Sequence, residues 1–181
     1  MLDIGIAPED AWNFSFLGCS EPVIEGRTDT WGNSGHLNLA KCLELALNDG
    51  VCMLTGVRMG PATGDPAAFT QFDEVVEAFQ AQTRYFIEAL VRYDNIIDAF
   101  HGSSAPLPLY SVVVKGCIEK GLEFNRGGAV YNTTSPLGVG PITAGDSLAA
   151  IKKLVFDEKK TTMAELADAL RTDFAGKEPL R

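Results

Sequence analysis

Histidine and basic residues are scarce in this sequence, and long apolar runs are absent from it. The only histidines are His36 and His101, so a multi-histidine metal site is not expected. Lys and Arg number 15 against 24 Asp and Glu, and the formal net charge of −9 repels nucleic acid and anionic membranes. No uncharged apolar window reaches the ~18 residues of a membrane-spanning helix, and the first residues do not resemble a signal peptide. We therefore expect neither nucleic-acid nor membrane binding, and a cytoplasmic location.

The four cysteines do not follow a disulfide or zinc-binding pattern. Cys19, Cys42, Cys52 and Cys117 are separated by 23, 10 and 65 positions, whereas zinc sites place pairs of cysteines a few residues apart. A chain of 181 residues that is 46% apolar can bury a core without such cross-links. Free thiols in a reducing compartment, and no bound metal, are therefore expected.

Apolar residues recur at helical spacing in several segments, which predicts an α/β chain rich in helices. The longest helix should start near Thr70 and keep one apolar stripe for about seven turns. Further helices are predicted over 35–48, 147–159 and 162–176, and a helix is favoured over a strand for 109–119. Val51–Leu54 is expected to form a short buried strand.

Polar residues at the starts of these segments resemble helix caps. Ser34 and Asp146 are expected to be N-caps. Capping boxes are expected at two further helix starts: Thr70 with Asp73, and Thr162 with Glu165.

Stretches that contain glycine and proline are expected to be loops at the strand ends of a barrel or sheet: 18–35, 56–66, 101–108 and 127–145. The last of them includes Gly138–Gly145, which superficially resembles a phosphate-binding loop. It lacks the Gly-Lys-Ser/Thr ending, and Pro141 removes one backbone donor. A tight glycine loop is therefore favoured over a phosphate site.

The hexapeptide Leu17–Pro22 holds the residues best suited to chemistry. If it is extended, the Cys19 thiol and the Glu21 carboxylate point to one face ~7 Å apart, with room for a small substrate. Gly18 would let another backbone approach the sulfur. A nearby carboxylate raises the pKa of a thiol, so the pair suits a thiol that works as S–H beside an acid or base. Taken alone, the motif is more typical of a small buried cysteine beside a surface glutamate.

Either histidine could instead pair with Cys19 as the nucleophile and base of a hydrolase. His36 lies at a predicted helix start and His101 in a predicted loop, and nothing in the sequence positions them beside the thiol. Structural or capping roles are favoured for both.

Taken together, these segments resemble the glycyl radical enzymes, the family of pyruvate formate-lyase and its eliminating and decarboxylating relatives. Gly18–Pro22 resembles the cysteine loop of that family, and 37–50 resembles the helix that follows it. Further matching segments come in the family's order: Gly60–Asp65, Gly127–Asn132 and Asp146–Val155. The resemblance covers essentially the whole chain and overturns the interpretation of the hexapeptide as a structural turn.

The resemblance implies a segment of a ten-stranded α/β barrel made of two half-barrels, with the cysteine loop threaded through its middle. Cys19 would become a thiyl radical that abstracts hydrogen from substrate, and Glu21 would act as general acid or base. The family's Arg-Val-x-Gly-Tyr type motif does not occur here. We therefore expect 1–181 to be a partial, C-terminal half-barrel domain, with a cysteine loop over 14–35 and helices and short strands over 35–176. The N-terminal half-barrel and the glycyl radical domain would be absent, and the isolated chain inactive.

Residues around the cysteine loop bear on the substrate. Pyruvate formate-lyase has two adjacent cysteines, whereas Cys19 lies between Gly18 and Ser20, which argues against formate-acetyl transfer. The diol and glycerol dehydratases carry a His-Asp pair after the loop tryptophan, whereas Trp31 is followed by Gly32 and Asn33. Asn33 can form hydrogen bonds but supplies no charge. Ser20, Trp31 and Asn33 are the expected substrate contacts, and elimination or decarboxylation of a small organic acid, alcohol or amine is the expected reaction.

The resemblance also implies partners. No cofactor or metal is expected on this chain, and a radical S-adenosylmethionine activating enzyme would act on the glycyl radical domain. The chain should form a homo-oligomer or join the remainder of the barrel. The alternative is a catalytically inactive fragment that folds and self-associates, because a partial barrel exposes apolar surface and strand edges.

Overall fold

A short antiparallel hairpin near the N-terminus carries the cysteine motif. In the computed structural model, which describes residues 1–18 and 21–181 but not the Trp31 side chain, β1 (Phe14–Leu17) pairs with β2 (Glu21–Ile24). Phe14 lies opposite Ile24 and Leu17 opposite Glu21. The predicted loop over 18–35 is therefore wrong in part, since it contains β2 and the start of a further strand.

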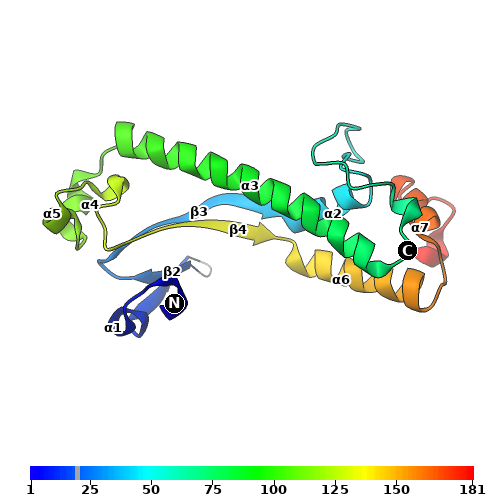
Figure 1. The fold of residues 1–181 in the computed structure, drawn as a ribbon, viewed down its shortest axis with the longest axis horizontal. Helices are drawn as coiled ribbons and strands as arrows, with labels where there is room; N and C mark the ends of the chain where they lie inside the picture. The colour runs from blue at the N-terminus through cyan, green and yellow to red at the C-terminus, as the bar shows by residue number, and fades with distance from the viewer. Residues whose placement is uncertain (19–20) are drawn as a thin grey trace. The chain divides into compact units, whose positions relative to one another are not determined.

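A second two-stranded sheet joins β3 (Thr28–Asn38) to β4 (Tyr131–Val139), and both strands run in the same direction (Figure 1). The sequence predicted a loop over 127–145, and this prediction is wrong except over 127–130 and at Gly140. Pro136 and Gly138 in β4 are typical of loops, but each strand of a two-stranded sheet has a free edge where proline is tolerated.

The chain divides into two compact units: 1–36 with 90–137, and 37–89 with 138–181. The first unit contains the hairpin, most of the two-stranded sheet and three short helices: α1 (Pro8–Ala11), α4 (Pro108–Val113) and α5 (Cys117–Lys120). The helix favoured over 109–119 is confirmed as α4 and α5, with a break between them. The expectation of a single partial barrel domain stays a prediction.

The second unit packs helices around one apolar core. Its helices are α2 (Leu39–Ala46), the first half of α3 (Phe72–Ser104), α6 (Pro141–Ile151) with a π-helical turn (Lys152–Asp157), and α7 (Met163–Arg171). The buried core consists of apolar side chains from these helices and from Leu47, the C-cap residue of α2. Its members are Leu43, Leu47, Val75, Ile151 and Met163. The long helix predicted from Thr70 is confirmed as α3. The described residues therefore form a mixed α/β structure, as predicted.

Several predicted helix starts are wrong. β3 extends to Asn38, and it is the Asn38 side chain, not Ser34, that accepts the Lys41 amide and starts α2. Helix α6 starts at Pro141 after Gly140, so Asp146 lies inside the helix. Proline suits the first helical position because it has no amide hydrogen to leave unpaired.

The two predicted capping boxes have different outcomes. Thr162 and Glu165 form the complete box at the start of α7, which confirms that prediction. At α3 it is Glu74, not Asp73, whose side chain accepts the amides of Thr70 and Gln71. Helix α7 also ends at Arg171, before the expected 176.

The strand predicted at Val51–Leu54 is reduced to an isolated bridge between Val51 and Arg58. The Cys52 amide donates to the Val57 carbonyl, and the Gly56 amide donates to the Cys52 carbonyl. These bonds close a tight turn, so the apolar run cannot extend into a sheet.

Among the residues that the structure describes, none of the helices combines the length and the apolar character of a membrane span.

Candidate functional site

Glu21 lies where the hairpin closes. It is the first residue of β2, pairs with Leu17 across the hairpin, and is 8% exposed. Gly18, Cys19 and Ser20 connect the two strands in sequence. Cys19 and Ser20 lie outside the described residues, so their predicted places beside Glu21 stay predictions. The structure does show that the glutamate is buried and not a surface side chain.

Two glycines make room for the Glu21 carboxylate. A Cβ atom on Gly18 would lie 3.0 Å from Glu21 Oε2, and one on Gly32 would lie 3.5 Å from Glu21 Cγ. Gly18 also has a φ of +61°, a left-handed conformation that favours glycine. We expected the bare Gly18 to admit a backbone near the sulfur; the structure shows it accommodating the carboxylate. The glycines and Glu21 together form what we call the glutamate niche.

The niche brings the start of β2 next to the middle of β3. Gly32 belongs to β3 and is followed by Asn33, which is exposed and has a φ of +62°. A left-handed conformation is uncommon for a residue other than glycine, although asparagine tolerates it better than most. The predicted substrate contact Asn33 therefore directly follows the glycine that leaves room for the Glu21 side chain. The Trp31 side chain, also predicted to contact substrate, lies outside the described part.

An ion pair between the buried Asp10 and the partly exposed Arg27 anchors the chain that leads into the hairpin. Asp10 is 5% exposed, and its Oδ2 accepts hydrogen bonds from Arg27 Nη1 at 2.7 Å and from the Tyr131 hydroxyl at 2.8 Å. The Ala7 amide donates to the Tyr131 hydroxyl at 3.1 Å. Sequence reasoning missed this cluster, because Asp10 and Tyr131 are 121 positions apart and no motif links them.

The described part of the chain does not place a histidine in a metal-binding group. His36 is exposed on β3, whereas His101 lies on α3 with its ring centroid 6.2 Å from that of Phe100. Among the described residues, no group of three His, Cys, Asp or Glu side chains could hold a metal ion. Pairing of either histidine with Cys19 stays untested.

Cys42, Cys52 and Cys117 are free, as predicted, and all three are buried. A hydrogen bond from Lys41 Nζ at 3.0 Å, helped by bonds from Thr55, lowers the pKa of the Cys52 thiol to about 7. Burial raises the pKa of the Cys42 and Cys117 thiols. The described thiols therefore differ in how readily they ionise.

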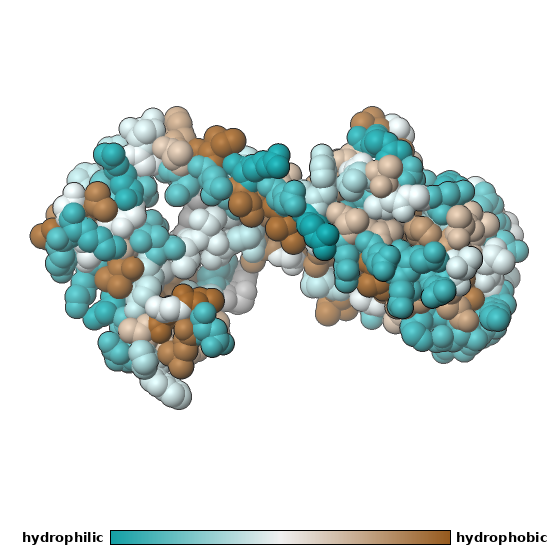
Figure 2. Space-filling view, viewed as in Figure 1, coloured by the Kyte–Doolittle hydropathy of each residue, from teal (hydrophilic) through white to brown (hydrophobic). Residues whose placement is uncertain are grey.

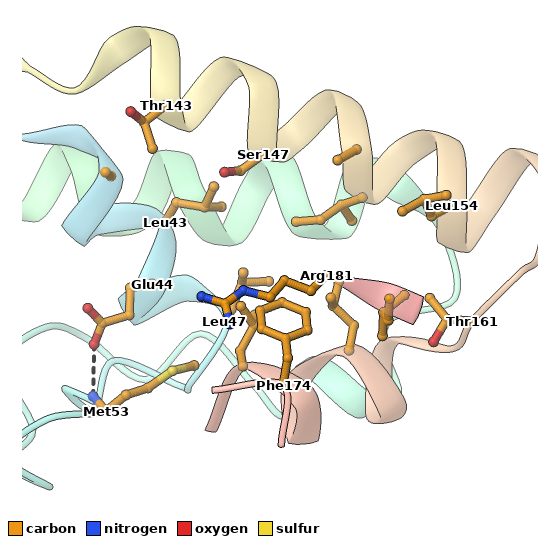
Figure 3. Close-up of a pocket in the computed structure, with 16 residues that line it drawn as sticks. Leu43, Glu44, Leu47, Met53, Thr143, Ser147, Leu154, Thr161, Phe174 and Arg181 are labelled. Atoms are coloured by element: carbon orange, nitrogen blue, oxygen red, sulfur yellow. Dashed lines mark hydrogen bonds between the residues drawn. The ribbon is translucent and has the colours of Figure 1, made fainter. Parts of the chain in front are cut away.

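Each unit contains a cavity. The first unit has a polar cavity of about 670 Å³ between β3 and the end of α3, and Asp29 and Asp98 are among its lining residues. Burial, and then the charges of Asp98 and Glu123, raise the pKa of Asp29 to about 6. The second unit has an apolar cavity of about 440 Å³, where Glu44 Oε1 accepts the Met53 amide at 2.8 Å (Figure 3). Glu21 lines neither of these cavities in the described structure.

Known proteins match the chain over its whole length. A family model described as "Pyruvate formate lyase-like" matches residues 1–181. Trans-4-hydroxy-L-proline dehydratase of Clostridioides difficile is 39% identical over 180 residues, which are 99% of this chain and 23% of that protein. (2S)-3-sulfopropanediol dehydratase of Klebsiella oxytoca is 34% identical, over 99% of this chain and 22% of that protein.

Solved structures match as well. The glycerol-bound form of the B12-independent glycerol dehydratase from Clostridium butyricum superimposes with a TM-score of 0.94 at 41% identity, over 98% of this chain and 22% of that chain. A glycyl radical enzyme from Archaeoglobus fulgidus gives a TM-score of 0.89 at 31% identity. The chain therefore spans about a fifth of the length of the relatives that it matches.

Proposed function

This chain belongs to the pyruvate formate lyase-like family, as its motifs predicted, and from that premise we propose that it is the acid/base and hydrogen-abstracting segment of a glycyl radical lyase. The two curated relatives described above are dehydratases, which favours elimination of water from a small hydroxyl-bearing molecule. Decarboxylation of a small organic acid is the less favoured alternative.

Cys19 and Glu21 divide the proposed chemistry between them. With an unpaired electron on its sulfur, Cys19 takes a hydrogen atom from a substrate carbon and becomes a thiol. The radical carbon's hydroxyl then gives its proton to Glu21 while the neighbouring carbon loses hydroxide, and proton and hydroxide together make water. The product radical takes the hydrogen atom back from Cys19, which restores the starting state.

The unpaired electron would come from a glycyl radical. The glycine motif does not occur in this sequence, so we propose that it lies on a domain outside 1–181 and is loaded by a radical S-adenosylmethionine activating enzyme. The residues described here would position and shield the substrate radical. Ser20, Trp31 and Asn33 are the proposed substrate contacts.

The buried Glu21 carboxylate carries this proposal. It is held directly after the cysteine connection, is only 8% exposed, and is surrounded by two glycines that leave space for it. Catalytic acids and bases are commonly found in such partly desolvated places. A glutamate that served only to keep the hairpin hydrated would be exposed, as Glu25 is.

The test uses the complete protein that carries this chain, activated under anaerobic conditions and assayed with glycerol and with trans-4-hydroxy-L-proline. We expect Cys19→Ala to abolish turnover, and Glu21→Gln to lower it by roughly 10²–10⁴-fold, the usual contribution of general acid–base catalysis. Glu25→Gln removes an exposed carboxylate four positions away and should keep full activity. Full activity in Glu21→Gln would show that its assignment as acid or base is wrong.

A further inference from the structure

A buried carboxylate lies behind the strand that carries Asn33. Asp94, on α3, is 5% exposed and Ser34, on β3, is 8% exposed. The Ser34 hydroxyl donates to Asp94 Oδ2 at 3.2 Å. The other carboxylate oxygen, Asp94 Oδ1, is buried and has no hydrogen-bond partner among the described residues.

This arrangement is costly for the fold. A buried carboxylate loses its hydration, and one hydrogen bond from a hydroxyl does not replace it. Buried polar atoms without partners are few in native proteins, and each requires an explanation. A leucine at position 94 would fill a similar volume without that cost, so the carboxylate needs a reason other than packing.

The neighbouring strand residues supply that reason. Ser34 directly follows Asn33, which has a φ of +62°, and Asn33 follows Gly32, where an added Cβ atom would lie 3.5 Å from Glu21 Cγ. Strained backbone persists only where the surrounding structure fixes it from more than one side. On the N-terminal side of Asn33, Gly32 packs against Glu21 in the glutamate niche. On its C-terminal side, the hydrogen bond from Ser34 to Asp94 holds the backbone.

We propose that Asp94 is a positioning residue which, through its hydrogen bond with Ser34, holds the Gly32–Asn33 stretch of β3 against Glu21. Its effect on turnover rests on the proposed function. Its effect on β3 does not, because it concerns the backbone alone. Asp94 itself does not contact the reacting atoms; it acts through Ser34.

The variants separate positioning from stability. Ser34→Ala and Asp94→Leu each remove the hydrogen bond, and Asp94→Asn keeps an oxygen that can accept it. In the double variant Ser34→Ala/Asp94→Leu both partners are apolar. If the single variants are unstable only because they leave one buried polar group unpaired, the double variant should regain the wild-type melting temperature. Gln82→Leu is the matched control, since Gln82 is a fully buried polar side chain on α3 that bonds to Pro61 and Thr63 and not to β3.

Two measurements are made on the complete protein: turnover, and hydrogen exchange of peptides covering β3 with α2 peptides as the internal standard. We expect each single loss of the bond, and the double variant, to lower kcat roughly tenfold, a factor that corresponds to one charge-assisted hydrogen bond. Exchange in β3 should be faster in the same variants and unchanged in α2. Asp94→Asn should keep kcat and exchange near the wild-type values, and Gln82→Leu should lower only the melting temperature.

The results distinguish this proposal from the proposed function. Recovery of both melting temperature and kcat in the double variant would overturn positioning and leave Asp94 a purely structural residue. Unchanged β3 exchange in Asp94→Leu would overturn it as well. If Cys19→Ala still turned over substrate, the proposed function would fail, and hydrogen exchange alone would decide the role of Asp94.

Discussion

At the scale of single residues, the two glycines of the glutamate niche leave the space that the Glu21 side chain occupies. Gly18→Ala would add a Cβ atom 3.0 Å from Glu21 Oε2 and move the carboxylate, so we expect kcat to fall at least tenfold. The substitution also costs about 1 kcal/mol because alanine disfavours a positive φ. Both effects can be measured on one purified variant of the complete protein that carries this chain, by steady-state kinetics and by thermal unfolding.

Gly26→Ala is the control for this prediction. Gly26 has a φ of +67° and nothing within 4 Å of the position a Cβ would take, so the alanine pays the same conformational cost and displaces no side chain. It should lower the melting temperature as Gly18→Ala does and leave kcat unchanged. Equal losses of kcat in the two variants would mean that the niche plays no part in catalysis.

The candidate site could be predicted from sequence only where its residues are close together in the chain. The proposed pair of Cys19 and Glu21 could be suggested from sequence because only two positions separate its members. The place of Gly32 beside Glu21, the pair Ser34–Asp94 and the anchor Asp10–Tyr131 depend on contacts across 11 to 121 positions, and short motifs carry no information on them.

At the scale of elements, the existence of the helices was predicted better than their ends, and the strands were predicted poorly. Helix α3 is predicted by apolar residues that recur at helical spacing over a long segment, and α7 is predicted by its capping box. Both are local signals. Strands β3 and β4 are stabilised by each other across about a hundred positions, and they contain the glycine, asparagine and proline residues that are typical of loops. Strand pairing, a tertiary effect, overrides that local preference.

Asp29, which lines the cavity between β3 and the end of α3, should make the stability of the fold depend on pH. Because burial, Asp98 and Glu123 raise the pKa of Asp29 from 3.8 to about 6, the charged form is disfavoured in the folded chain. The protonated form of Asp29 therefore stabilises the folded chain relative to the charged form. This stabilisation is fully present below pH 3.8 and is lost as the pH rises through about 6. Asp29→Asn should therefore raise the melting temperature at pH 7, by about 3 °C for each 1 kcal/mol recovered, and give no gain below pH 3.8.

Thermal unfolding at a series of pH values checks this prediction. Asp3→Asn removes a charge of the same sign from an exposed position, and so controls for the general relief of a chain with a net charge of −9. A gain in Asp29→Asn that is the same at every pH, or the same as in Asp3→Asn, would contradict a local origin.

At the scale of the whole molecule, the chain exposes much apolar surface. Large apolar side chains gather along α3 (Figure 2), and the exposed ones there include Ile87, Val91, Ile96 and Phe100. Phe16 on the hairpin is 66% exposed as well. Exposed apolar patches of this kind are typical of surfaces through which proteins associate.

We therefore expect residues 1–181, produced alone, to self-associate and to be catalytically inactive. Light scattering after size-exclusion chromatography should show a mass above 19.4 kDa that rises with concentration. Association should strengthen with salt, because screening weakens the repulsion between chains of net charge −9. Replacing Ile96 and Phe100 together by Ser should weaken it, whereas a monomer at all concentrations would contradict the prediction.

The short connection between β1 and β2 also restricts how this segment can change. Leu17 pairs with Glu21, so three residues join the strands, and side chains alternate between the two faces of a strand. One inserted residue within β2 would therefore turn every later side chain of that strand to the opposite face. Side chains of β2 can therefore be exchanged at constant length while the later residues keep their faces, whereas a change of length within this strand alters all of those faces together.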